Sequence, residues 1–358
     1  MRWKQTLAIL SLSAITITGC ANNSTGGSST TEAMAAGEGI TLTNCGEEKT
    51  YMATNNLMVN DGNIIAMVLA AGGRENIKWV SSLDDDADIL KAKYGQDAEN
   101  LESVSDNMPS LEEIVAKHPD VMVAGWNYGF TEGKNLTPDA LKQHDINSYI
   151  LTESCRQPGT TKRGVVDPWK AVEDDVTNFG KLTGHEDTAA AVVKDQQERL
   201  AALNAAPKPE KTPVTFVFDS AKDSIFTSGK FGGPQAIIEA AGGKNAADSI
   251  EDTWTDVGWE FLTEQNPDVF VMVDYPGQTF EEKVKILKER ETTKDLPAVK
   301  ENRFINLPYA MWTSSPLNID AAEYVRKAYE KFGLAPSSDV ATKLTLPESL
   351  QGREYFVE

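Results

Sequence analysis

One pattern of apolar and polar positions occurs twice along this chain of 358 residues. In each copy a glutamate opens a short amphipathic stretch, a proline ends it, and a run of apolar residues follows. The copies cover residues 112–123 and 260–271. Proline cannot continue a helix, and short apolar runs are typical of buried strands, so each copy predicts a helix followed by a strand. The repeat therefore indicates two α/β lobes.

A second pair of matching segments supports this division. An alanine-rich apolar helix is predicted before Gly72-Gly73 in the first half and before Gly242-Gly243 in the second. Glycine is the preferred residue in the left-handed position that follows a helix. The Glu112 and Glu260 copies are 148 residues apart and the glycine pairs are 170 residues apart. Unequal offsets indicate a duplicated architecture with different loops, and exclude a solenoid of tandem repeats.

The remaining pattern predicts the domain organisation. An N-terminal α/β lobe is expected over 40–166, a bridging helical segment over 167–210, a C-terminal α/β lobe over 211–335 and a tail over 336–358. Strands are predicted at 79–82, 121–124, 148–151, 214–218, 269–273 and 304–307. The stretches 169–181 and 183–205 have helical spacing, and the second is long enough to brace both lobes and limit their hinging. Apolar residues of the tail, Leu344 with Leu346 or Tyr355 with Phe356, are expected to pack back on the body.

The N-terminus carries an export signal. Arg2 and Lys4 precede an apolar run that is too short to span a bilayer, which predicts a signal peptide over 1–19. The end of this segment resembles the lipobox of bacterial lipoproteins, which implies that Cys20 is acylated and anchors the protein to the membrane. Residues 20–39 then suit a flexible lipidated tether. The alternative is an ordinary cleaved signal with a coincidental cysteine.

Export changes the interpretation of the two other cysteines. Cys45 and Cys155 are the thiols that remain, and an oxidising compartment favours their pairing. We expect a Cys45–Cys155 disulfide, the alternative being two separate buried thiols.

The composition is strongly acidic, with a formal net charge of −20. Removal of the signal takes away the positive charges of Arg2 and Lys4, which leaves −22. Such a chain is not expected to bind nucleic acid or anionic lipid through its overall field. The acidic runs at 84–86 and 173–175 are interpreted as solvated helix starts, where negative charge suits the helix dipole. No segment after the signal is apolar enough to cross a membrane.

Residue patterns that would indicate catalysis or a bare metal site are weak. His185-Glu186 lacks the second histidine of a zinc protease, and no Gly-x-Ser-x-Gly motif occurs. The histidines, His118, His144 and His185, are not clustered as a zinc or manganese carrier requires. We therefore expect no enzyme, no cofactor and no resident metal. A structural or adhesive surface lipoprotein is the alternative class.

Several segments resemble the substrate-binding proteins of ABC importers for iron–siderophores, haem and cobalamin. The resemblance covers about 41–332. It is carried by Ser110-Leu111-Glu112 with Pro119-Asp120-Val121 and by the segments 226–230 and 254–260. The last two segments look like the corresponding segments of cobalamin-binding members. The segments 44–46 and 151–155 look more like an actinobacterial branch. The resemblance to this family implies an α/β fold of two Rossmann-like lobes bridged by a single long α-helix, the class III arrangement. It also implies a monomer that delivers a small-molecule ligand to a permease dimer with a cytoplasmic ATPase.

The resemblance assigns a role to the repeated glutamates. In that family one glutamate near the tip of each lobe docks into arginines of the permease, and the matching residues are Glu112 and Glu260. Exposed pairs of this kind contribute orientation and steering more than affinity. The alternative is that both are ordinary acids of a first helical turn.

Candidate ligand contacts are residues on loops after the predicted strands. Bulky planar ligands require aromatic faces and a few charges. The backbone after Ser228 precedes a helix and could receive an anion. The full candidate set is Trp126, Tyr128, Phe130, Arg156, Arg163, Phe226, Ser228, Trp254, Tyr275, Tyr309 and Trp312.

The expected ligand is an iron–siderophore-type chelate. Anionic chelates are usually met by arginines, and the chain has few of them, with Arg156 and Arg163 at a plausible rim of the cleft. This scarcity favours a neutral or weakly charged chelate or a corrinoid. Haem stays open as well, because Tyr128, Tyr275 or Tyr309 could supply an axial ligand.

Overall fold

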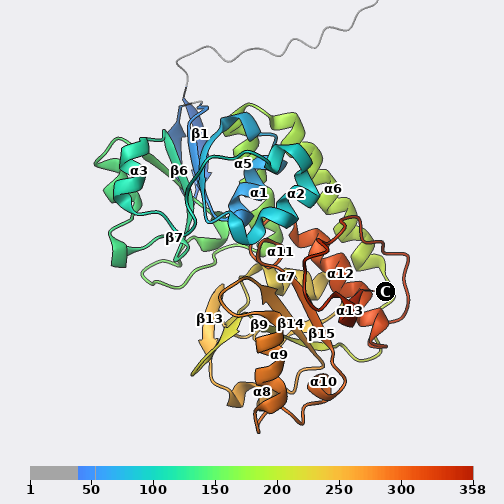
Figure 1. Cartoon of the computed structure of the whole chain (residues 1–358). Helices are drawn as coiled ribbons and strands as arrows, with labels where there is room; N and C mark the ends of the chain where they lie inside the picture. Colours follow the sequence, from blue (N-terminus) through green and yellow to red (C-terminus); the bar gives the residue numbers. More distant parts are fainter. Residues whose placement is uncertain (1–38, 53, 358) are drawn as a thin grey trace, which may run out of the picture. The chain divides into compact units, whose positions relative to one another are not determined.

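Two parallel sheets organise the chain in the computed structural model, one in each half of the sequence (Figure 1). The structure describes residues 39–52 and 54–357, and 39–358 form one compact unit. The predicted signal peptide, Cys20 and nearly all of the tether lie outside the described residues. We call the half that contains the first sheet the N-terminal lobe and the other half the C-terminal lobe.

The N-terminal lobe is built on parallel strands in the order β5-β4-β3-β6, with β8 pairing β6 on its other side. The strand bounds are β3 (Leu57–Asn60), β4 (Ile77–Ser81), β5 (Ser103–Ser105), β6 (Val121–Trp126) and β8 (Asn147–Ile150), and the short β7 (Gly129–Phe130) pairs the end of β6. The helices between them are α1 (Gly62–Ala70), α2 (Ala87–Tyr94), α3 (Leu111–Lys117) and α4 (Pro138–Lys142).

The C-terminal lobe repeats this design with the parallel order β12-β9-β14-β15. Its bounds are β9 (Val214–Phe218), β12 (Lys244–Asn245), β14 (Val269–Asp274) and β15 (Phe304–Pro308). A small antiparallel sheet joins β10 (Ser220–Ala221), β11 (Ile225–Ser228) and β13 (Trp254–Val257). The helices are α7 (Gly233–Ala240), α8 (Glu260–Gln265), α9 (Phe280–Glu289), α10 (Pro297–Lys300), α11 (Tyr309–Trp312), α12 (Asn318–Lys331) and α13 (Arg353–Phe356).

The repeated sequence patterns occupy equivalent places in the two lobes. The first pattern forms α3 followed by β6, and its copy forms α8 followed by β14. Each helix is followed by one left-handed residue directly before the proline, His118 (φ 49°) after α3 and Asn266 (φ 42°) after α8. The glycine pairs end α1 and α7 as expected, with Gly72 at φ 87° and Gly242 at φ 94°. The prediction of two α/β lobes is confirmed.

Two consecutive helices lead from one lobe to the other. The first, α5 (Pro168–Thr183), packs mainly on the N-terminal lobe and ends at the left-handed Gly184. The second, α6 (Glu186–Ala205), has 20 residues and is therefore about 30 Å long. It contacts α1 of the N-terminal lobe and both α7 and α12 of the C-terminal lobe (Figure 1). This helix is the single long bridge of the class III arrangement.

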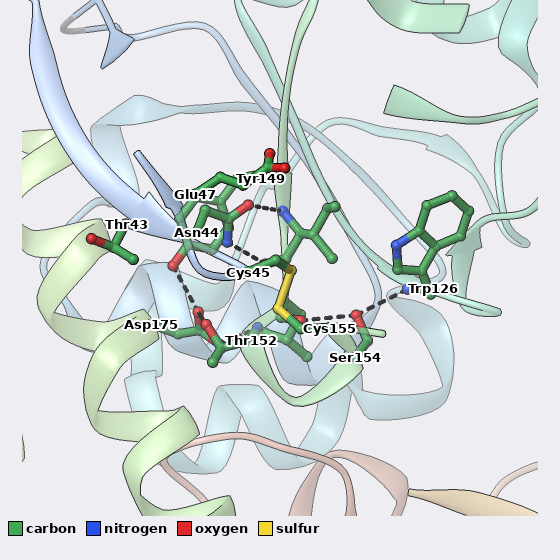
Figure 2. Close-up of a disulfide and its surroundings, with 12 residues drawn as sticks. Thr43, Asn44, Cys45, Glu47, Trp126, Tyr149, Thr152, Ser154, Cys155 and Asp175 are labelled. Atoms are coloured by element: carbon green, nitrogen blue, oxygen red, sulfur yellow. Dashed lines mark hydrogen bonds between the residues drawn. A yellow bond between two sulfur atoms is a disulfide. The ribbon is translucent and has the colours of Figure 1, made fainter. Parts of the chain in front are cut away.

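A hairpin that the sequence did not indicate precedes the N-terminal sheet. It pairs β1 (Ile40–Asn44) with β2 (Glu47–Tyr51), and its turn carries Cys45. Cys45 forms the expected disulfide with Cys155, which follows β8 (Figure 2). The Asn44 amide also donates to the Ile150 carbonyl at 2.7 Å and accepts from the Ile150 N–H at 2.9 Å. The hairpin is thus attached to the end of β8 by two hydrogen bonds and to the following loop by the disulfide.

The interpretation of the two acidic runs as solvated helix starts is wrong for two of their members. Asp86 is only 1% exposed, and its Oδ1 accepts from the backbone N–H of Ala310 at 2.9 Å. Asp175 is fully buried inside α5 and accepts from Tyr149 and Thr152. Both carboxylates have structural partners that only the folded chain brings close.

The C-terminal tail packs back on the body as the sequence predicts. Leu344, Leu346 and Phe356 are each less than a tenth exposed, and the Tyr324 hydroxyl donates to the Leu344 carbonyl at 2.6 Å. Among the described residues, no helix has the length and apolar character needed to cross a membrane.

A cleft between the two lobes

The strand order creates a crevice in each lobe at an equivalent place. In the N-terminal lobe the chain builds outward from β3 through β4 and β5, and then reverses to β6 and β8 on the other side. In the C-terminal lobe the same reversal occurs between β9 and β14. Ligands of open α/β sheets bind at the carboxyl ends of strands at such switch points.

The residues that follow these strands meet around one cavity. Asp61 comes directly after β3, Asp219 directly after β9, and Tyr275 directly after β14. The cavity has a volume of about 690 Å³. Its lining residues come from both lobes: Asp61, Ser82, Asp85, Asp106, Asn107, Met108, Asn127, Tyr128, Arg163, Asp219, Ser220, Phe226, Trp254, Thr255, Asp256, Tyr275, Tyr309 and Thr313.

Aromatic rings form two pairs on the C-terminal side of the cavity. Phe226 and Trp254 are stacked on the small antiparallel sheet, with ring centroids 5.9 Å apart. Tyr275 and Tyr309 meet edge to face at 6.3 Å. These faces can bury an apolar or planar ligand surface.

Arg163 holds the two lobes together at the rim of the cavity. Its Nη1 donates to the Trp126 carbonyl at 3.2 Å, and its Nη2 donates to the Trp254 carbonyl at 3.0 Å. Its Nε lies 3.8 Å from a carboxylate oxygen of Asp252. The preceding loop folds back on itself, with the Gly164 N–H donating to the Cys155 carbonyl at 2.9 Å. Gly164 has φ 91° and faces Phe231 so closely that a Cβ would overlap it.

Two carboxylates lie buried in the cavity wall, and each is bonded to a tyrosine. Tyr309 donates to Asp61 at 3.2 Å, and Tyr275 donates to Asp219 at 2.9 Å. Burial raises the pKa of Asp61 to about 7, although the bonds from Tyr309 and Gly62 favour its ionised form. Burial also raises the pKa of Asp219. Proton loss from Asp61 therefore falls near neutral pH.

A family model described as periplasmic binding protein matches residues 80–310, which include most of both lobes and the bridge. The chain belongs to the periplasmic binding protein family. Members are extracytoplasmic solute-binding proteins, not enzymes, and work with an ABC permease and its ATPase. Comparison with the curated proteins found no significant match.

Solved structures with the same fold include several bacterial binding proteins. One, from an ABC-type Fe3+-hydroxamate transport system of Saccharomonospora viridis, is 21% identical, with 82% of this chain and 99% of that chain covered and a TM-score of 0.66. A periplasmic haem-binding protein from Pseudomonas aeruginosa is 18% identical, with 81% and 96% covered and a TM-score of 0.59. The molybdate-binding protein MolA of Haemophilus influenzae is 16% identical, with 82% and 92% covered and a TM-score of 0.61.

Six of the predicted contact residues line the cleft of this binding protein: Tyr128, Arg163, Phe226, Trp254, Tyr275 and Tyr309. Trp126 and Arg156 do not line it. The Arg156 guanidinium lies 3.7 Å from the centroid of the Trp126 ring and pairs with Glu132, with Nη2 to Oε2 at 3.0 Å. This stack belongs to the outside of the N-terminal lobe, because Arg156 lines a separate hollow beside the disulfide.

Three other candidates are buried in the packing, contrary to expectation. Phe130, Ser228 and Trp312 are each 0% exposed. The Trp312 Nε1 donates to the Met272 carbonyl at 2.9 Å, and the Ser228 hydroxyl donates to the Thr253 carbonyl at 3.1 Å. The backbone N–H groups of 229–232 also have carbonyl partners, so this segment does not present the anion site that its sequence suggested.

The sequence reasoning missed the acidic residues of the cleft. Five aspartates line it: Asp61, Asp85, Asp106, Asp219 and Asp256. A usable indication was present for two of them, since Asp61 and Asp219 each come directly after a strand, one in each half of the chain. Among residues 39–52 and 54–357, no three His, Cys, Asp or Glu side chains are grouped to hold a metal ion.

Proposed function

We propose that this binding protein is a monomeric, lipid-anchored receptor of an ABC importer that captures an iron–siderophore-type chelate between its lobes. The observation that carries the proposal is the cavity of about 690 Å³ between the two lobes, with two aromatic pairs on its C-terminal side. That volume is in the range of small-molecule sites, and a chelate presents a compact, largely apolar surface to such walls. The fold neighbour from an Fe3+-hydroxamate system supports the same ligand class.

Haem and cobalamin are the alternative ligands in the same cleft. Haem is favoured by the haem-binding fold neighbour and by three tyrosines at the cavity, since tyrosine can ligate haem iron. All three phenols already donate to a carboxylate: Tyr128 to Glu153 at 3.0 Å, Tyr275 to Asp219 at 2.9 Å and Tyr309 to Asp61 at 3.2 Å. This favours the chelate over haem. The family membership disfavours a structural or adhesive lipoprotein.

The decisive experiment is a titration followed by tryptophan fluorescence. Trp254 lines the cavity, so a chelate that enters should quench its emission. The protein over 39–358, which forms one compact unit, would be titrated with a ferric trihydroxamate, a ferric tricatecholate, haem, cobalamin and free Fe3+. We expect saturable quenching by a siderophore-type chelate and none by the bare ion.

A pair of tryptophan variants controls for quenching elsewhere. Trp254→Phe should remove most of the response, whereas Trp79→Phe should leave it, because Trp79 lies beside Glu102 and Lys117 outside the cleft. Saturable binding of haem or cobalamin alone would replace the chelate assignment. An unshifted melting temperature with every compound would contradict the proposed ligand class.

We also propose that Glu112 and Glu260 contact the permease. Both are exposed, and they occupy the first turns of α3 and α8, the equivalent helices of the two lobes. Reversal of both charges, Glu112→Lys with Glu260→Lys, should abolish uptake by cells, because such pairs orient the receptor on its permease. The dissociation constant of the ligand should stay within about twofold, because neither residue lines the cavity. The matched control reverses Glu75 and Glu264, which are also exposed acids, one in each lobe. Unchanged uptake with the first pair would contradict the docking role.

Membrane attachment through Cys20 is part of the same proposal. Cells fed a labelled fatty acid should label the wild-type protein and not the Cys20→Ser variant, which should be released from the membrane fraction. Equal labelling of the two proteins would contradict the anchor.

A further inference from the structure

The walls of the cleft carry an excess of negative charge. Asp61 and Asp219 are buried in the wall, 7% and 5% exposed. Asp85, Asp106 and Asp256 are exposed toward the opening. Behind Asp61, the Asp86 carboxylate is 1% exposed, and its Oδ2 has no hydrogen-bond partner among the described residues. Burial raises the pKa of Asp86 well above its ordinary range, so the negative charge of the cleft is that of the five lining aspartates.

The basic groups near the cleft are engaged in other contacts and are not available to pair with an anionic ligand. Arg163 is the basic residue among those that line it, and its guanidinium is 6% exposed and directed at two carbonyls and Asp252. Lys283 is 0% exposed and donates to the Val273 carbonyl. Its ammonium lies 4.8 Å from the centroid of the Tyr275 ring, and it is not among the lining residues. An anionic ligand would therefore meet carboxylates without a free basic partner.

Aromatic rings accompany the buried carboxylates in both lobes. Asp219 is bonded to Tyr275, and Asp61 is bonded to Tyr309, whose ring meets that of Tyr275. Phe226 and Trp254 add a stacked pair on the same cavity. Carboxylates combined with aromatic faces are the combination that binds organic cations, by ion pairing and by cation–π attraction.

We propose that the ligand is a cationic chelate, with a protonated amine directed at the buried carboxylates of the cavity, Asp61 and Asp219, and its apolar surface against the aromatic pairs. This inference rests on the proposed function, because it names the charge class of the solute that the receptor takes. It differs from the expectation of a neutral or weakly charged chelate that the scarcity of arginines suggested.

The test compares probes that share one metal centre and differ in charge. The ferric complex of desferrioxamine B carries a free ammonium, and its N-acetylated form has the same chelate without that charge. We expect the cationic complex to bind at least about tenfold more tightly, with an advantage that shrinks at high salt. A ferric tricatecholate, which is anionic, should bind more weakly than either.

Variants locate the charge preference in the cleft. Asp61→Asn should remove most of the tenfold difference by weakening the cationic complex alone. Asp85→Asn with Asp256→Asn, at exposed positions that do not affect the core, should reduce the difference. Asp223→Asn is the control, since Asp223 is exposed and does not line the cavity.

The outcomes separate this inference from the proposed function. Equal affinity for the two ferric complexes, or tighter binding of the tricatecholate, would overturn the cationic ligand and leave a chelate receptor. Equal binding of metal-free desferrioxamine B would retain the cation preference and overturn the chelate assignment. Absence of binding by both the ferric complex and the metal-free form of desferrioxamine B would overturn the inference.

Discussion

The hydroxyl of Tyr309 donates to a carboxylate oxygen of Asp61 at 3.2 Å and thereby joins the two lobes in the wall of the cleft. Tyr309 is the first residue of α11, directly after β15, and Asp61 caps the start of α1, directly after β3. The other oxygen of Asp61 accepts from the Gly62 N–H at 3.1 Å. A ligand group that binds Asp61 therefore acts on a residue whose hydrogen bond with Tyr309 joins the two lobes.

Removal of the Tyr309 hydroxyl should lower the stability of the ligand-free protein and its affinity for cations. Without this donor the ionised form of Asp61 loses a stabilising bond, so the Asp61 pKa should rise further above its ordinary range. We expect Tyr309→Phe to lower the free energy of unfolding by about 1 kcal/mol and to weaken the cationic complex at pH 7. Chemical denaturation and calorimetric titration measure the two effects. Tyr355→Phe, which keeps a ring packed on Phe280 and Phe304, is the control and should change neither.

The stability of the apo protein should depend on pH in an unusual direction. Burial raises the pKa of Asp61, Glu153 and Asp175 to about 7 in each case. Between their unfolded values near 4 and pH 7 the folded chain binds more protons than the unfolded chain, so stability falls as pH rises through this window. The total loss should be on the order of a few kcal/mol, measured by chemical denaturation at pH 5 and pH 8.

A variant assigns part of this pH effect to the cleft. Asp61→Asn cannot titrate, so its stability should change less between pH 5 and pH 8. The groups around Asp61 are Tyr309, which stabilises its charge, and Asp85 and Asp86, which oppose it. A wild-type protein that gains stability from pH 5 to pH 8 would contradict the inverted dependence.

The same carboxylate should link cation binding to proton release. A cation beside Asp61 favours its ionised form, so binding near pH 7 should release a fraction of a proton and tighten as pH rises from 6 to 8. Calorimetry in two buffers of different ionisation enthalpy measures the released proton. Uptake of protons on binding would exclude Asp61 as the group that meets the cation.

The disulfide should contribute strongly to stability, because it closes a loop of 110 residues. The chain-entropy model predicts a stabilisation of up to about 5 kcal/mol for a loop of this length, although the origin of the effect is disputed. Cys45→Ala with Cys155→Ala should lower the unfolding free energy by several kcal/mol in denaturant. Treatment of the wild type with a reductant should give the same loss, and an equal stability of oxidised and reduced protein would contradict this prediction.

The sequence predicted the repeated elements because their pattern is local. The α3–β6 and α8–β14 pairs, the glycine ends of α1 and α7, and strand β9 at 214–218 all follow from apolar periodicity and from turn residues. The α-helical bridge was expected from residue 183, and the observed α6 begins at Glu186 because Gly184 ends α5. The β1–β2 hairpin was missed because its strands are short and polar, and are held by Cys45 and Asn44.

The cleft was predicted less well, since its chemistry depends on contacts between distant residues. Placement after strands identified Tyr275 and Tyr309, but the same rule included Trp312, whose ring lies in the core. Arg163 was expected to serve a ligand, and the fold uses it between two carbonyls. The acidic character of the cavity arises only when Asp61 and Asp219, 158 positions apart in sequence, come to line one cavity.

A buried ion cluster fixes the bridging helix to the C-terminal lobe. Arg199 of α6 is 6% exposed and donates from Nε to Glu323 at 2.7 Å and from Nη2 to Asp320 at 2.5 Å. Asp320 also pairs with Lys93 of α2 at 2.7 Å, so the cluster reaches the N-terminal lobe. Both carboxylates are almost completely buried.

Loss of the Arg199 charge should therefore be costly. In Arg199→Met the two buried carboxylates lose their main partner, and we expect the free energy of unfolding to fall by about 3–5 kcal/mol. The control is Lys211→Met, which breaks an exposed pair with Asp268 and should cost about 0–1 kcal/mol. Chemical denaturation of both variants at pH 7 gives the comparison. Since α6 contacts both lobes, a cost for Arg199→Met no larger than that of the control would mean that apolar packing, and not this cluster, holds the bridge in place.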